Sequence, residues 1–416
     1  MDAGRRLLRR PLTDDDRARL AGDYAVGGDH SVAEGVATLL IAMLIDPEFL
    51  YYAQTEGEEI ADGVVALTPH ETAAKLARVL WSSIPDDELL DAADAGLDDT
   101  MLAAQVDRML DDPRAREAVA GFYYDWLELE RLPFPSETLF PDPEVQSALK
   151  DAMEAELLAF AETMTLDNDA TYAELLLDRT AVVESPELAG LYGVAAGSDP
   201  VELPSDERAG ILTRAGFLAT SEIRGSNAGH LIKRGAKLSH IICRPLPLPD
   251  PDNFPQEDPA DPLSDPDQGI RARFDAATAE PMCASCHVQL DGLGAPFGHY
   301  GSAGEWIDLE TIDLPSGATN DLEIDTAAQV ELDDGPIDVS DGLALSQALA
   351  ESHVGAQCLA QHLTRNIVAR ALEPADACMV DVATSVLAPE EGEPQSIREA
   401  LVQLVLSTHF RSATIQ

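Results

Sequence analysis

The residues with the clearest chemical signature lie in the stretch PMCASCHVQLDGLG, residues 281–294. Cys283, Cys286 and His287 follow the spacing Cys-x-x-Cys-His in a chain that has only five cysteines. Two intervening residues let one helical turn present both sulfurs to one edge of a porphyrin, where they form thioethers with the vinyl groups. The histidine then lies under the iron as an axial ligand. The spacing predicts one covalently attached haem c.

Three other interpretations use the same residue types. A thioredoxin-like dithiol normally lies between a strand and a helix of a βαβ unit, and that pattern does not surround the motif. A structural zinc site needs four ligands, and the sequence has no second Cys-x-x-Cys or His-x-x-x-His pair to complete one. Cysteines with a purely structural role are the third alternative. Other catalytic templates, such as Gly-x-Ser-x-Gly, His-Glu-x-x-His or a P-loop, are missing from the sequence.

The second axial position of the iron would decide what such a haem does. Methionine raises the potential, a second histidine lowers it, and an open position admits peroxide or another small ligand. His299 follows the motif closely, in the glycine-rich segment GLGAPFGHYG, and is our first candidate for the second ligand. The alternative is a surface histidine without a role in ligation.

Residues near the motif could also hold the porphyrin. Arg271 and Arg273 lie on a short helix that we expect just before the motif, and they are candidate donors to the haem propionates. Exposed arginines on an amphipathic helix are the alternative. Trp306 follows the motif and is a candidate packing partner for the porphyrin face, or else an ordinary core residue.

Three further cysteines allow one disulfide and one free thiol, with three possible pairings. They are Cys243, Cys358 and Cys378. A simple helix hairpin would place Cys358 and Cys378 on the order of 20 Å apart. An extended return segment through Glu373 and Pro374 would close that distance, so proximity in sequence favours the pair Cys358–Cys378.

The net charge of the chain limits the classes of molecule that it can bind. Seventy-six acidic residues against 27 basic ones give a net charge of −49, which excludes a basic footprint for nucleic acid. A positively charged redox protein is the partner that this surface would attract. Adaptation to high salt and a generally acidic proteome both account for the composition. The longest apolar stretch, residues 36–45, is too short to span a membrane, and no export signal follows the basic N-terminus.

Helix-start signals dominate the chain and predict a mainly α fold. A helix start is expected at Thr68, which forms a capping box with Glu71 and is followed by Pro69 at the first helical position. A long helix is expected over residues 144–164. Residues 243–268 are rich in proline and aspartate, which favours an extended wrap over a surface. The expected segments are an N-terminal helical segment (1–60), a multi-helical domain (61–200), a haem c domain with the Pro-rich wrap (205–306), a small β-meander (307–342) and a C-terminal helical domain (343–416).

These segments together resemble the planctomycete-type and myxobacterial cytochrome-like proteins, which are built from tandem domains of unknown function. Those domains are the 1595, 1592, 1588 and 1585 families. The resemblance covers nearly the whole chain and rests on several stretches taken as a set: RRPLTDDDRARLAGDY, TAAKLARVLWSSIPDDELLDAADAG, ERAGILTRAGFLATSE, CASCHVQLDGLGAPFGHYGSAGEW and CLAQHLTRNIVARAL. The sequence departs from the family pattern at Gly292, where proline is usual, and at Ala295, where phenylalanine is usual.

The resemblance implies a periplasmic or surface c-type cytochrome rather than a named enzyme. We therefore expect electron transfer outside the cytoplasm, with the export signal missing from this chain. One alternative is a haem-dependent oxidoreductase of the peroxidase type with an open sixth site. Another is a structural or surface assembly protein. The large helical part exceeds what a bare cytochrome needs, about 80 to 120 residues, and mildly favours a role beyond electron carriage.

Overall fold

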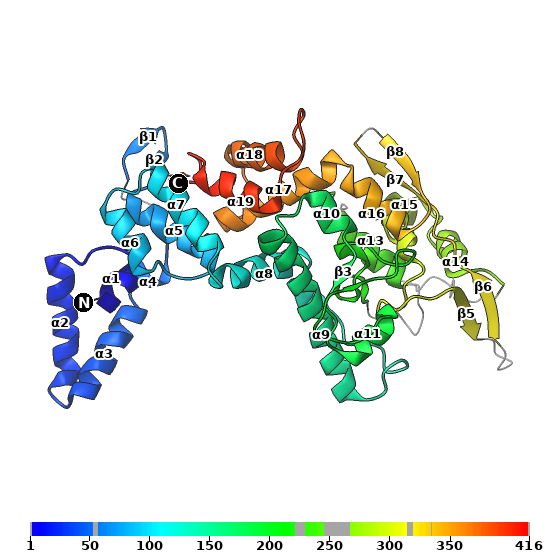
Figure 1. The fold of residues 1–416 in the computed structure, drawn as a ribbon, viewed down its shortest axis with the longest axis horizontal. Coiled ribbons are helices and arrows are strands. Elements are labelled where there is room, and N and C mark those ends of the chain that lie inside the picture. The colour runs from blue at the N-terminus through cyan, green and yellow to red at the C-terminus, as the bar shows by residue number, and fades with distance from the viewer. Residues whose placement is uncertain are drawn as a thin grey trace. The chain divides into compact units, whose positions relative to one another are not determined.

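The protein is mainly α-helical, as the sequence predicts. The computed structural model describes residues 2–52, 57–220, 229–244, 267–313, 319–333 and 335–414, and these residues form nineteen α-helices with a few short antiparallel strand pairs (Figure 1). Most of the predicted Pro-rich wrap lies outside the described residues. Within them, no helix is both long enough and apolar enough to cross a bilayer.

The chain forms two compact units whose boundaries differ from the predicted segments. One unit combines residues 1–119, 364–383 and 399–416, and the other combines residues 120–363 and 384–398. The division falls within four helices: α8 (Arg114–Trp126), α17 (His353–Val368), α18 (Ala377–Leu387) and α19 (Ile397–Leu406). Residues 343–416, which the sequence suggests as one helical domain, therefore contribute to both units.

The second and third helices of the first unit pack against each other, and the sheet of this unit joins distant parts of the chain. Strand β2 pairs antiparallel with both β1 and the C-terminal strand β9, although the sequence shows no strand signal around residue 60. The capping box of Thr68 and Glu71 is present and starts α5 as predicted. The elements are α1 (Asp2–Leu8), α2 (Asp14–Gly28), α3 (Val32–Leu44), α4 (Pro47–Leu50), β1 (Glu59–Ala61), β2 (Val64–Ala66), α5 (Pro69–Trp81), α6 (Asp87–Asp94), α7 (Asp99–Leu110) and β9 (Ser412–Thr414).

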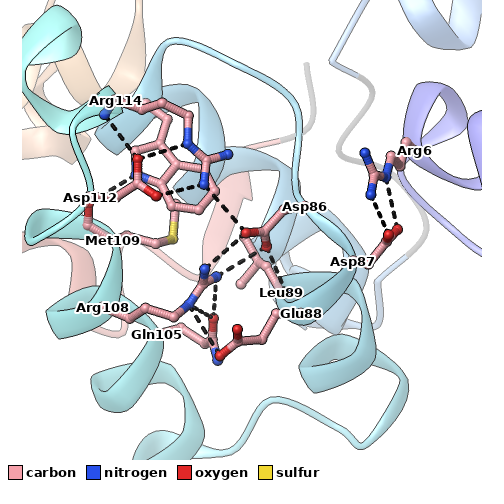
Figure 2. A network of polar contacts seen from close by, with 11 residues as sticks. Arg6, Asp86, Asp87, Glu88, Leu89, Gln105, Arg108, Met109, Asp112 and Arg114 are labelled. Carbon is pink, nitrogen blue, oxygen red and sulfur yellow. Dashed lines mark hydrogen bonds and ion pairs between the residues drawn. The ribbon is translucent and has the colours of Figure 1, made fainter.

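Ion pairs connect the starts of α6 and α8 with the end of α7. Asp86 caps α6 by accepting from the Leu89 N–H and receives hydrogen bonds from the Arg108 guanidinium at 2.8 and 3.1 Å. Figure 2 shows Arg114 reaching both Asp86 and Asp112. Side-chain and backbone hydrogen bonds from Arg114 lower the pKa of Asp112 to about 2. Negative charge is thus stabilised where helix dipoles also favour it.

Acid should weaken the first unit through Asp112. A carboxyl whose folded pKa is lowered stabilises the fold above its unfolded pKa, and that contribution disappears as pH falls toward the folded value. We expect the wild-type free energy of unfolding to fall between about pH 4 and pH 2, and D112N to show a shallower slope there. Urea unfolding at a series of pH values measures this. D15N changes the same charge at an exposed position of α2 and should keep the wild-type slope.

The second unit is built on α9 (Pro143–Glu162), close to the long helix predicted over residues 144–164. Its core includes Leu149 and Met153 of α9 together with Tyr192 and Ala303. The other elements are a π-helical turn (Thr163–Asp167), α10 (Tyr172–Leu177), β3 (Thr180–Ala181), α11 (Pro186–Tyr192), β4 (Val201–Glu202), α12 (Ala215–Leu218), α13 (Gly229–Ile241), α14 (Ile270–Ala277), α15 (Pro281–Gly294) and α16 (Gly342–Ala350).

The predicted β-meander is wrong in its connectivity. Within the described part of residues 307–342, the strands form two separate hairpins, β5 (Leu309–Asp313) with β6 (Thr319–Glu323) and β7 (Ala328–Leu332) with β8 (Gly335–Val339). Strand β7 alternates buried and exposed residues and packs against α15. Burial of one face of β7 against α15 accounts for the alternation of apolar and polar residues in that strand. The β5–β6 hairpin is mostly exposed and forms a separate sheet.

Glycines let α13 and α15 approach closely. A Cβ atom on Gly235 would lie 1.9 Å from the Leu290 carbonyl oxygen, and one on Gly294 would lie 1.8 Å from the Leu231 carbonyl oxygen. No side chain larger than hydrogen fits at either position without displacing the backbone of the other helix. The glycine-rich run after the motif, which suggests a loop, is therefore helical up to Gly294 and ends in a 3₁₀ turn.

A buried arginine fixes the segment that follows α15. The Arg234 guanidinium donates hydrogen bonds to the carbonyl oxygens of Leu218 (2.9 Å), Phe297 (2.9 Å), Tyr300 (2.6 Å) and Gly301 (2.6 Å). Burial lowers its pKa to about 10, so the group remains a cation at neutral pH. Buried charge is tolerated only when it is fully hydrogen-bonded, and these carbonyls meet that condition.

Removal of this cation should strongly destabilise the second unit. R234M leaves four carbonyl oxygens without their donor, and we expect a loss of about 3 to 5 kcal/mol in the free energy of unfolding. Urea unfolding followed by circular dichroism measures the loss. R131Q, at an exposed arginine of the same unit, should change the free energy by less than about 0.5 kcal/mol. Equal effects of the two variants would contradict the role assigned to Arg234.

Candidate functional site

The Cys-x-x-Cys-His motif lies in the first half of α15. Pro281 occupies the first helical position, where its missing N–H costs no hydrogen bond. Cys283 shares a helix face with Cys286 and His287, because residues three and four apart are neighbours on a helix. Neither cysteine is in a disulfide, and both are only half-buried. One helical turn therefore carries two thiols and an imidazole.

His287 faces a carboxylate one turn further along the same helix. Its Nδ1 atom lies 3.4 Å from Oδ2 of Asp291, which is a buried residue. Burial raises the pKa of the Asp291 carboxyl, and the neighbouring His287 opposes that rise. Among the described residues, neither Nδ1 of His287 nor Oδ1 of Asp291 has a hydrogen-bond partner. This pair directs Nδ1 toward the protein and leaves Nε2 as the ring atom suited to bind a metal.

Helix α14 covers this histidine and holds both predicted propionate donors. The Phe274 ring lies 6.3 Å from the His287 ring, measured between centroids. Arg273 is buried and donates to Glu310 at 2.9 Å. Arg271 donates to the Ala327 carbonyl and lies 3.7 Å from Asp325. Both guanidiniums therefore have partners within the protein. Because Arg273 is buried and bonded to Glu310, the structure does not favour it as a ligand-binding group. Their role toward propionates stays a prediction.

His299 and Trp306 form a stacked pair after the motif helix. Their ring centroids are 4.8 Å apart and the ring planes differ by 15°. Nδ1 of His299 donates to the Ile307 carbonyl at 2.9 Å, because a carbonyl oxygen only accepts. In the neutral ring this leaves the lone pair on Nε2, the tautomer needed for ligation through that atom. The two residues singled out in sequence therefore contact each other, and their roles toward a haem stay predictions.

A cavity of about 210 Å³ lies among α13, α14 and the β5–β6 hairpin. His230, Arg234, Arg271, Asp275 and Glu310 contribute to its polar lining. Burial, together with the nearby cations Arg234 and Lys233, lowers the pKa of His230 to about 3, so this imidazole is neutral at pH 7. No motif in the sequence indicates this cavity, because its walls come from segments that are far apart in the chain.

The predicted disulfide Cys358–Cys378 is wrong. Cys358 bonds to Cys243, with the two Cα atoms 5.4 Å apart, and Cys378 is an exposed free thiol. Helix α17 continues for ten residues beyond Cys358, which carries the chain about 15 Å along the helix axis before α18 begins at residue 377.

Contacts at the end of α13 bring the two bonded cysteines together. The rings of His240 and His362 lie 4.9 Å apart, so the end of α13 packs on α17 beside the bond. His362 is buried, and its ring nitrogen and the two sulfurs lie within 4.8 Å of one another. Sequence spacing does not reveal this pairing, because the partners are 115 residues apart.

Thiol labelling should distinguish the two pairings. Alkylation of unreduced, haem-free protein should modify Cys283, Cys286 and Cys378, and peptide mapping should recover Cys243 linked to Cys358. The double variant C243S/C358S should lose about 2 to 5 kcal/mol of stability, since the bond closes a long loop. C378S should leave both the linked peptide and the stability unchanged. A peptide that joins Cys358 to Cys378 would contradict the structure.

Two family models match the chain in tandem. Residues 67–194 match PSD4, described as a protein of unknown function (DUF1592), and residues 208–310 match PSCyt3, described as a protein of unknown function (DUF1588). The second match includes α15 and the whole motif. These matches confirm the tandem order of the 1592 and 1588 domains that the sequence resembles, and they assign no activity. Neither the curated proteins nor the solved structures contain a match to this chain.

Proposed function

We propose that the protein carries one haem c on α15 and transfers electrons outside the cytoplasm. The observation that carries this proposal is the arrangement of Cys283, Cys286 and His287 within one helical turn, with neither cysteine in a disulfide and both partly exposed. Thioether formation needs accessible thiols, and iron ligation needs an imidazole on the same face of the helix. A haem bound there would supply a one-electron iron couple.

Other side chains around the motif fit the same cofactor. The buried Nδ1 of His287 faces Asp291, so the chain holds the imidazole in the orientation that exposes Nε2. Phe274 supplies an apolar contact to the ring of His287. The α13–α15 contact through Gly235 and Gly294 keeps the motif helix on a rigid support. These features would hold the imidazole in position for a haem on α15.

Charge and the disulfide support the proposed partner and compartment. A net charge of −49 attracts a basic redox protein and repels nucleic acid. The Cys243–Cys358 bond is expected to persist in an oxidising compartment, where c-type haem is also attached. Both features are compatible with a periplasmic or surface location.

The cavity beside α14 favours a second candidate function. A haem whose sixth position is open would bind peroxide or another small ligand, as in haem-dependent oxidoreductases. Asp275 and Arg271 line the cavity and also act electrostatically on Asp291, so the cavity lies near the motif. If His299 occupies the sixth position instead, the haem is low-spin and electron transfer remains the better proposal.

Expression with an export signal and a c-type maturation system tests the cofactor. We expect wild-type protein to gain the mass of one haem and to give a c-type pyridine hemochrome spectrum. C283A/C286A should lose the covalent haem, because both thioethers are gone. C378A, which removes the exposed free thiol, should keep it. Unmodified wild-type protein with two titrating thiols at Cys283 and Cys286 would overturn the proposal and leave a structural or assembly role.

The optical spectrum of the same protein separates the two functions. A sharp low-spin Soret band that cyanide and peroxide do not move supports electron transfer, and conversion to high spin in H299A would identify His299 as the second ligand. A broad high-spin band that shifts with peroxide would instead favour the oxidoreductase.

A further inference from the structure

The carboxylate next to His287 is placed to control that ligand. Asp291 lies four residues after His287 on α15, so the helix places the two side chains next to each other, with Nδ1 3.4 Å from Oδ2. A hydrogen bond between these atoms would be about 2.7–2.9 Å long, so a small side-chain rotation would complete it. Such bonds are often long in the unliganded protein and tighten when the ligand is in place.

One polar atom of each residue is buried without a hydrogen-bond partner among the described residues. In the part of the chain that the structure describes, Nδ1 of His287 and Oδ1 of Asp291 are buried and have no hydrogen-bond partner. A buried polar atom without a partner costs about 1–3 kcal/mol, and a hydrogen bond between the two residues would remove part of that cost. The polar atoms therefore favour a ring orientation in which Nδ1–H points at Asp291.

The charges around Asp291 do not neutralise it. Arg271 and Asp275, both on α14, act on the carboxylate with opposite sign. The Arg271 guanidinium also forms an ion pair with Asp325, with nitrogen and oxygen 3.7 Å apart, and donates to the Ala327 carbonyl. Asp291 has no ion pair with an arginine or lysine among the described residues, and its nearest charged or chargeable partner is His287.

We propose that Asp291 is a positioning residue that accepts the Nδ1–H of His287, fixes the imidazole with Nε2 directed at the iron, and lowers the reduction potential of the haem. This inference rests on the haem c proposed above. A carboxylate acceptor makes the imidazole a stronger electron donor than a neutral acceptor does. A stronger donor stabilises ferric iron more than ferrous iron, so the potential falls.

Replacement of the carboxylate by an amide tests the inference at one fixed pH. In haem-loaded protein, D291N keeps the shape of the side chain and weakens the acceptor. We expect the ferric-to-ferrous equilibrium to shift at least tenfold toward ferrous iron, a rise of about 59 mV for a one-electron couple. The iron–histidine stretching frequency of the ferrous protein should fall where the haem is five-coordinate. Electrochemical titration and resonance Raman spectra measure the two effects.

D275N is the matched control. It removes one negative charge on α14 that also acts on Asp291, and among the described residues no ion pair or ring contact joins Asp275 to His287. We expect D275N to shift the equilibrium by much less than tenfold. Equal shifts in D291N and D275N would show that only net charge affects the potential, and this would overturn the role of Asp291. An unchanged potential in D291N would overturn it as well.

A measurement on the wild-type protein keeps the test decisive if D291N does not fold. In the diamagnetic ferrous carbon monoxide complex, a slowly exchanging Nδ1–H proton on His287 supports the hydrogen bond, and rapid exchange with solvent overturns it. Failure of the wild-type chain to bind haem covalently would overturn the proposed function itself. The mass spectrum recorded first therefore separates that failure from a failure of the inference.

Discussion

The arrangement of the motif depends on one buried cation. Arg234 binds the carbonyl oxygens of Leu218, Phe297, Tyr300 and Gly301, and the last three are more than 60 residues away in sequence. A guanidinium has five donors in a rigid fork, so it can hold several backbone segments at once. The same helix contacts α15 through Gly235. One side of α13 thus fixes the chain that follows the motif, and another side fixes the motif helix itself.

Local signals in the sequence predict the helices well, and long-range pairing escapes them. The capping box at Thr68 starts α5, and the long helix α9 lies where its apolar spacing places it. Strand β2 pairs with the C-terminal strand β9, and Cys243 bonds to Cys358 across 115 residues. The spacing of residues along the sequence indicates neither contact. The hairpins β5–β6 and β7–β8 form separate sheets, and α15 packs against β7 of the second hairpin. The alternation of apolar and polar residues does not contain this packing, so by itself it suggests a single meander.

The sequence motif indicates the two sulfurs and the histidine of the candidate site, but it does not indicate the residues that support them. Cys283, Cys286 and His287 stand out because those residue types are rare in this chain. Asp291 is one of 76 acidic residues, and only burial next to an unpartnered ring nitrogen distinguishes it. The sequence gives no sign that His299 and Trp306 contact each other, and their stacking appears only once the segment after α15 folds back on itself.

The bond between Cys243 and Cys358 encloses the motif in a covalent ring of the chain. A protease that cuts the backbone once anywhere between these cysteines opens the ring without dividing the molecule. The motif helix would stay tethered to the rest of the protein, and only a reducing agent would release the pieces. An intact mass measured without reductant would therefore show the addition of one water rather than two fragments, so a nicked chain could keep its cofactor and remain in one piece.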